Sequence, residues 1–192
     1  MSIPKFNPRT TLLLVIICFV AVLRLSTNMT KELSPLVMYS PLGAMALFGG
    51  AYFKGNIKPF AFPLLALFIS DLVLSFTVFS EFRSGLLYGG WYWVYGSFAL
   101  MTIAGKLLIK DVNIKSILTA TLVTVLIHWL ISDLGAALSQ NGFANIMTTY
   151  QLRLVSAIPY ELRFLSSTII YSGIMFGSFE LLKNRVVAPE AR

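Results

Sequence analysis

Apolar segments long enough, or nearly long enough, to cross a lipid bilayer make up most of this chain of 192 residues. Hydrophobic residues account for 57% of the sequence and charged residues for only 12%, which is about half the charged fraction of a typical soluble domain. A helix needs roughly 20 apolar residues to span the hydrocarbon core of a bilayer. The composition therefore predicts an all-α membrane protein with one transmembrane domain over residues 1–192.

Six apolar segments alternate with loops that carry most of the charges and helix-breaking residues. The predicted transmembrane helices are residues 10–26, 39–53, 60–79, 86–109, 116–138 and 163–183. The first is expected to be an uncleaved membrane helix, because no small-x-small cleavage pattern follows it. The longest connection, residues 139–162, is predicted to be an external loop that folds over a binding site as a lid.

Lysine and arginine positions predict the orientation of this six-helix bundle. With both termini in the cytoplasm, ten of the 15 basic residues fall in inner segments and five in outer ones. Cytoplasmic loops carry such an excess of positive charge. The net charge of +7 is therefore explained by topology, and no nucleic-acid partner is expected because the basic residues stand singly.

Two aspartates lie inside bilayer-length apolar stretches, Asp71 in the third predicted helix and Asp133 in the fifth. A carboxylate in hydrocarbon is costly unless it faces a polar interior, a partner or water, so such residues are candidates for function. Asp71 is predicted to bind a polar or cationic part of a ligand, or to form a structural intramembrane pair. Asp133 lies near the outer interface, where a ligand contact and a simple helix-end role are both open.

His128 is the only histidine, and Cys18 is the only cysteine. His128 precedes Asp133 by five residues, so the two side chains point about 140° apart on a helix. No metal site, disulfide or cofactor is expected, and a hydrogen-bonded histidine is favoured. The chain lacks a phosphate loop, a nucleotide-binding glycine pattern, HExxH and GxSxG, so it is not predicted to be an enzyme, and no catalytic residue is assigned.

Aromatic and basic residues also gather at the predicted outer end. An aromatic cluster at the start of the fourth helix is either an interfacial belt or a stacking surface for a planar ligand; it contains Tyr88, Trp91, Tyr92, Trp93 and Tyr95. Arg153 and Arg163 are predicted to bind an anionic group of cargo, to pair with an aspartate, or to contact lipid headgroups. Gly43, Ala46 and Gly50, and also Gly173 and Gly177, have the small-residue spacing of close helix packing.

Three parts of the chain carry a family resemblance: SPLGAMALFGGAYF at residues 40–53, Ser70-Asp71-Leu72, and AIPY at residues 157–160 followed by Arg163 and Tyr171-Ser172-Gly173. Together they resemble the signature of an uncharacterised bacterial family of six-helix integral membrane proteins. That family is similar to the substrate-binding S components of energy-coupling factor (ECF) vitamin transporters, including the solitary cobalamin transporters.

The resemblance implies an S-component-like bundle with both termini cytoplasmic and an outward-facing site roofed by external loops. S components dock their energising subunit through an Ala-xxx-Ala motif in the first helix, where this chain has only Ala21. Solitary cobalamin transporters are similar in carrying a cysteine near the fourth helix, where residues 80–85 have none. An ECF-type energising module is therefore one option, and solitary action is the other.

The sequence and the resemblance together predict a multi-pass protein of the bacterial inner membrane that takes up a vitamin or vitamin precursor. Its partners would be the lipid bilayer and this small-molecule cargo. Two alternatives stay open, a membrane scaffold or assembly protein and an intramembrane enzyme that uses His128 with an aspartate.

Overall fold

The computed structural model describes residues 39–141 and 145–186, together with Val15, Cys18, Val22, Leu25 and Ser26, which are helical. The rest of the predicted first helix and of the loop after it lies outside the described residues, as do both chain ends. Five α-helices form the described ranges: α2 (Leu42–Tyr52), α3 (Lys58–Phe76), α4 (Trp91–Leu108), α5 (Ile114–Asn141) and α6 (Ile146–Val186). Between α3 and α4 lie the 3-10 helix η2 (Ser80–Phe82) and a hairpin of β1 (Arg83–Ser84) and β2 (Leu87–Tyr88).

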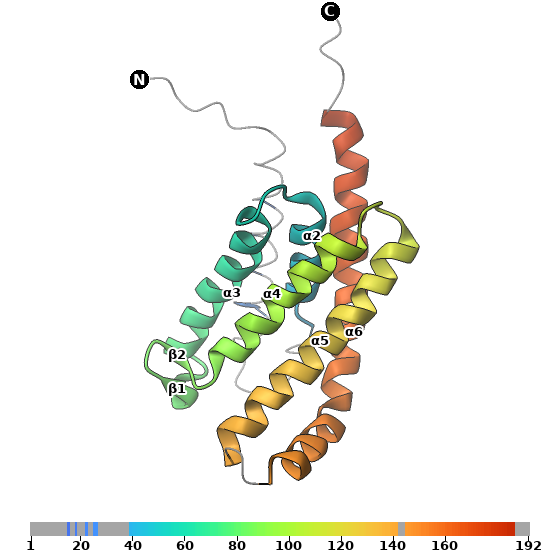
Figure 1. The fold of residues 1–192 in the computed structure, drawn as a ribbon. Coiled ribbons are helices and arrows are strands. Elements are labelled where there is room, and N and C mark those ends of the chain that lie inside the picture. Colours follow the sequence, from blue (N-terminus) through green and yellow to red (C-terminus); the bar gives the residue numbers. More distant parts are fainter. Residues whose placement is uncertain are drawn as a thin grey trace, which may run out of the picture.

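The helices α3 to α6 run alternately up and down, so the described connections gather at two ends of the bundle (Figure 1). We call the end with the β1–β2 hairpin, the last turn of α5 and the first turn of α6 the hairpin end. The opposite end carries residues 53–57 and 109–113, which include Lys54 and Lys110, and we call it the lysine end.

The short helix α2 occupies the centre of the bundle, and every residue from Leu42 to Gly50 is buried. Glycines let its backbone approach α4 closely. A Cβ on Gly50 would overlap the carbonyl oxygen of Thr102, and a Cβ on Gly105 would lie 2.8 Å from the carbonyl oxygen of Leu47. Gly43 packs in the same manner against the side chain of Thr168 on α6. The close packing predicted for Gly43 and Gly50 is thus confirmed.

Gly173 and Gly177 differ from this pattern. Both are exposed on α6, and a Cβ on either would meet nothing within 4 Å among the described residues. The close packing predicted for this pair is therefore not found in the described part of the chain. Small-residue spacing alone does not say which helix face meets a neighbour.

Beside its apolar core, the described bundle also buries polar side chains and exposes large apolar ones. Small hydroxyl side chains are buried, namely Ser70, Ser75, Ser97, Thr102, Thr121, Thr124, Ser167, Thr168 and Ser172. Large apolar side chains are exposed, and on α5 they form a stripe at four-residue spacing: Leu118, Leu122, Leu126 and Leu130. Exposing apolar surface of this extent to water is unfavourable, whereas contact with lipid is favourable. Membrane helices also often pack against one another through small polar residues.

Three of the described helices are long and apolar enough to cross a membrane, over Lys58–Phe76, Ile114–Gln140 and Ile146–Leu182. The helix α2, at 11 residues, is apolar but shorter. The prediction of a helical, membrane-type protein is therefore confirmed at this level. Six spans and the side of the termini remain predictions.

The predicted lid loop over residues 139–162 is wrong, because α5 continues to Asn141 and α6 begins at Ile146. Contacts with α5 hold the first turns of α6: the Trp129 indole N–H donates to the Leu154 carbonyl oxygen at 3.2 Å, and the Tyr150 hydroxyl donates to the Leu130 carbonyl oxygen at 3.0 Å. Pro159 lies inside α6. Figure 1 shows the first turns of α6 inclined to the rest of the helix. Polar side chains on a packed helix were thus mistaken for a loop.

The fourth helix was also predicted to start too early, at residue 86. The chain instead forms a two-residue turn at Gly85 and Leu86, in which Gly85 has a φ of 86°. Glycine at the first central position with positive φ suits the type II′ turn of a β-hairpin. Gly90, with a φ of 77°, then reverses the chain into α4.

Candidate functional site

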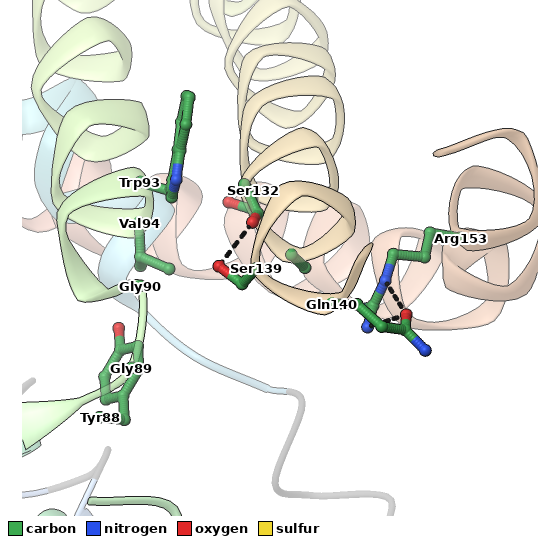
Figure 2. Close-up of a pocket in the computed structure, with 11 residues that line it drawn as sticks. Tyr88, Gly89, Gly90, Trp93, Val94, Ser132, Ser139, Gln140 and Arg153 are labelled. Carbon is green, nitrogen blue, oxygen red and sulfur yellow. Dashed lines mark hydrogen bonds between the residues drawn. The ribbon is translucent and has the colours of Figure 1, made fainter. Parts of the chain in front are cut away.

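A cavity of about 390 Å³ opens at the hairpin end, between β2, α4, α5 and the first turns of α6 (Figure 2). Its lining comprises Tyr88, Gly89, Gly90, Trp93, Val94, Ser132, Gly135, Ala136, Ser139, Gln140 and Arg153. The volume lies within the usual range for small-molecule sites, and the lining combines aromatic surface with a few polar groups, as such sites do. We call it the hairpin-end cavity.

Trp93 supplies the largest apolar surface of this cavity. The residue is half-buried in the first turn of α4, and its side chain lies directly against the backbone of α5 at Gly135. A Cβ on Gly135 would overlap the Trp93 side chain, so only glycine leaves room for the indole there. The indole and the Tyr88 ring both come from the segment just after the hairpin turn, and both are planar groups on which a ring can stack.

Arg153 supplies the positive charge of the cavity. Its guanidinium donates from Nη2 and Nε to the Gln140 side-chain oxygen, at 3.0 and 3.3 Å. Figure 2 shows these two side chains pointing toward one another from α6 and α5. A guanidinium has five N–H donors, so this contact leaves others for a carboxylate or phosphate. None of the residues that line the cavity is acidic.

Two serines of α5 place hydroxyl groups on the same wall. The Ser139 hydroxyl donates to the Gly135 carbonyl oxygen at 2.9 Å, and the Ser132 oxygen lies 3.5 Å from that of Ser97 on α4. Both serine oxygens keep lone pairs able to accept a further hydrogen bond. Ser132, Gly135 and Ser139 were not singled out from the sequence, although their spacing of three and four residues places them on one helix face.

Of the predicted aromatic residues, Tyr88 lines the cavity, and it does so from strand β2 rather than from a helix. Trp91 and Tyr92 are exposed, and Tyr95 is half-buried with its ring 5.2 Å from that of Trp91. These three are not among the lining residues. Their arrangement at the hairpin end matches an interfacial belt, and a ligand contact for them stays a prediction.

The charged residues that the sequence singled out do not gather at one site. Asp71 is buried in the second half of α3, with an exposed fraction of only 3%. Asp133 is half-buried on α5, and Arg163 is exposed on α6. Of the two predicted arginines, only Arg153 reaches the cavity, and its described hydrogen bonds go to Gln140.

His128 forms the hydrogen bond that the sequence favoured, and its partner is Glu161 of α6. The two side chains meet at 2.9 Å between Nδ1 and Oε1. The imidazole is 4.6 Å from the Phe164 ring and 5.7 Å from the Phe98 ring, measured between centroids. Glu161 was placed in the predicted lid loop and was not recognised as a partner, because its position on α6 opposite α5 is a tertiary feature.

Across the described residues, no group of three or more histidine, cysteine, aspartate or glutamate side chains could hold a metal ion. The His128–Glu161 pair supplies two donors and Asp133 is not placed to complete a set. The side chains that line the described site can form hydrogen bonds, stack against a ring and pair with a negative charge.

Comparison with known proteins adds a family. The model of DUF6580, a family of unknown function, matches residues 4–191. The chain belongs to this family. No curated protein and no solved structure matches the chain. The DUF6580 match agrees with the predicted membership of an uncharacterised family, and the function of this DUF6580 protein has to be argued from the cavity itself.

Proposed function

We propose that this DUF6580 protein is a substrate-binding membrane transport protein that takes up a small organic micronutrient, a vitamin or a precursor, from the outer side. The observation that carries the proposal is the hairpin-end cavity, which combines Arg153 with two rings and two hydroxyls in a bundle whose outer surface is apolar. A site of this size and lining suits a small planar molecule with a negatively charged group.

Charge distribution supports an outward-facing cavity. Five of the described lysines cluster at the lysine end: Lys54, Lys58, Lys106, Lys110 and Lys115. Lys106, in the last turn of α4, donates to the carbonyl oxygen of Gly55 at 3.2 Å, which joins α4 to the connection between α2 and α3. Because positive residues favour the cytoplasmic side, the lysine end would face the cytoplasm of a bacterial inner membrane and the cavity would face outward.

The resemblance to ECF S components supports the same reading, since those proteins bind vitamins on the outer side of a small helical bundle. Asp71, buried in the second half of α3, would then act as a second polar anchor.

The test is ligand-induced stabilisation of the detergent-purified protein, screened with vitamins and their precursors. We expect planar carboxylates or phosphates to raise the melting temperature. Arg153→Ala should weaken the binding by about tenfold to a hundredfold, because a hydrogen bond to a charged group contributes about 1.5–3 kcal/mol.

Arg163→Ala is the matched control, since Arg163 is exposed and does not line the cavity. It should leave binding unchanged. The proposal fails if no compound stabilises the protein and native mass spectrometry finds no bound small molecule. Equal loss in both variants would remove Arg153 as the anchor. A scaffold or assembly role would then be the better explanation of the bundle.

A further inference from the structure

The two connections at the lysine end repeat a short sequence. Residues 54–58 read Lys-Gly-Asn-Ile-Lys and residues 110–115 read Lys-Asp-Val-Asn-Ile-Lys, so each has an Asn-Ile-Lys step with a second lysine before it. In both, the isoleucine stands where a helix begins: Ile57 directly precedes α3, and Ile114 is the first residue of α5. The same combination of charged and apolar side chains therefore occurs twice at one end of the bundle.

Both isoleucines are exposed. Each has an exposed fraction of 78%, the highest of any large apolar side chain among the described residues. An isoleucine that faces water is unfavourable, whereas a lysine can lay its aliphatic stem along apolar surface and keep its charged group in water. The lysines on either side of the two isoleucines are exposed as well, namely Lys54, Lys58, Lys110 and Lys115. Such a surface suits a boundary between an apolar and a charged medium.

Local hydrogen bonds define the turns that carry these side chains. The Asn113 side-chain oxygen accepts from the Ser116 backbone N–H at 2.9 Å, and the Ser116 hydroxyl donates to the Asp111 carbonyl oxygen at 2.6 Å. Asn113 thereby caps the first turn of α5. In the other connection, Gly55 turns the chain with a φ of 97°, and its carbonyl oxygen accepts from Lys106 of α4. Both isoleucines therefore follow turns that are fixed by contacts within the fold.

The position of the two connections matches the surface of a bilayer. Two of the candidate membrane spans, Lys58–Phe76 and Ile114–Gln140, begin at these lysines and isoleucines. The ends of a spanning helix lie where the acyl chains of a bilayer give way to the headgroups. The connections 53–57 and 109–113 are short, so their side chains stay near that depth.

The charge of this end is strongly positive. Two acidic residues are described near it, Asp111 in the second connection and Glu180 of α6. The Glu180 carboxylate accepts a hydrogen bond from the Tyr52 hydroxyl, so it already has a partner within the bundle. A layer of negative charge over apolar chains complements the lysines and the isoleucines together, and this is the surface that a bilayer of anionic lipid offers.

We propose that the two connections of the lysine end form a binding surface for anionic phospholipids. Their lysines contact the phosphate groups, and Ile57 and Ile114 contact the adjoining acyl chains. Lysine suits this role because it binds phosphate as a point charge on a flexible stem. The proposal goes beyond the proposed function and does not depend on it, because the surface lies at the end of the bundle opposite the cavity.

Competition between two lipids tests the proposal. The detergent-purified protein, stripped of lipid, is mixed with equal amounts of dioleoylphosphatidylglycerol and dioleoylphosphatidylcholine, which have the same acyl chains and differ in headgroup charge. Native mass spectrometry counts the copies of each lipid that are bound. We expect phosphatidylglycerol to be bound in preference, and added salt to reduce this preference by screening the charges.

Paired lysine substitutions locate the surface. Lys54→Gln with Lys58→Gln, and Lys110→Gln with Lys115→Gln, should each reduce the amount of phosphatidylglycerol bound in preference. All four substitutions together should lower the ratio of phosphatidylglycerol to phosphatidylcholine by tenfold or more, since one lysine near an anionic surface contributes about fivefold. The four side chains are exposed, so the variants are expected to fold, and melting curves check this.

Two further variants serve as controls. Arg83→Gln with Arg163→Gln removes two positive charges from β1 and α6, outside the two connections, and should leave the lipid preference unchanged. Ile57→Ser with Ile114→Ser removes apolar surface but no charge. It should weaken the binding of both lipids to the same extent, because their acyl chains are identical.

Each other outcome overturns part or all of the proposal. Equal binding of the two lipids by the unaltered protein would overturn it, and an acidic protein partner would then be the better explanation of the lysines. A preference that survives the four lysine substitutions, or that falls equally in the arginine variant, would overturn its assignment to the lysine end. Unchanged lipid binding in the isoleucine variant would exclude the two isoleucines from the surface. None of these results would alter the test of ligand binding in the hairpin-end cavity.

Discussion

Single residues decide the shape of the hairpin-end cavity. Trp93 can lie flat against α5 only because residue 135 has no side chain, and Arg153 is held at the rim by the Gln140 side chain. Sequence inspection found Arg153 as a candidate anion-binding residue and included Trp93 in an aromatic cluster. It could not find Gly135, because the requirement for glycine there comes from a tryptophan on another helix.

Gly135→Ala tests this dependence. The new methyl group would overlap the Trp93 side chain and force the indole into the cavity or out of it. We expect loss of ligand-induced stabilisation, together with a decrease of about 1–3 kcal/mol in the free energy of unfolding, as is common for overpacking. Gly96→Ala on α4 is the control, since a Cβ there meets nothing within 4 Å among the described residues. Equal effects of the two changes would contradict the argument.

At the scale of the elements, the crossing of α2 and α4 depends on the close approach of the two helix backbones. Gly50 of α2 faces the backbone of α4, and Gly105 of α4 faces the backbone of α2, so the two backbones pack without intervening side chains. This arrangement explains how a helix of 11 residues with almost no polar face can be buried along most of its length.

Gly50→Ala should therefore disrupt the crossing. A Cβ there would overlap backbone atoms of Thr102 and lie 2.7 Å from the amide nitrogen of Lys106, and backbone cannot move aside as a flexible side chain can. We expect a loss of about 1–3 kcal/mol of stability or failure to accumulate folded protein. Gly173→Ala serves as its control and should be neutral in a thermal melt. A melting temperature unaffected by Gly50→Ala would show that the helices are further apart.

The elements also show what could be predicted from the sequence. The four helices α2 to α5 follow the apolar segments closely, because hydrophobic length alone identifies helices of this kind. The start of α6 was missed because its polar residues resemble a loop, and its helical state depends on contacts with Trp129 and Leu130 of α5. The hairpin carried a local signal, the pair Gly85-Leu86, which suits a two-residue turn.

At the scale of the whole molecule, the positions of the lysines and of the hairpin-end cavity bear on how the protein would be oriented in a membrane. The lysines and the cavity occupy opposite ends of the bundle, so the direction in which the protein is inserted decides which solution reaches Arg153. The side of the membrane on which each end lies is a prediction from the positive-inside rule, whereas the cavity depends on contacts between helices that the sequence does not show.

Labelling of introduced cysteines tests the orientation. Cys18 is the only cysteine, so Cys18→Ser gives a background without thiols. In that background Ser84→Cys, on the exposed hairpin, should react with a membrane-impermeant maleimide in intact cells. Asn56→Cys, exposed at the lysine end, should react only after the cells are opened. The reverse pattern would place the cavity on the cytoplasmic side and exclude uptake from outside through it.

Pro159 bears on the direction of the first turns of α6. Its nitrogen carries no hydrogen, so the carbonyl oxygen of Val155 lacks its usual helical donor, and helices commonly bend at such a residue. The part of α6 before the proline carries Arg153, whereas Trp93 and Ser139 belong to α4 and α5. The separation between the guanidinium and the opposite wall of the cavity therefore depends on the bend at a single proline.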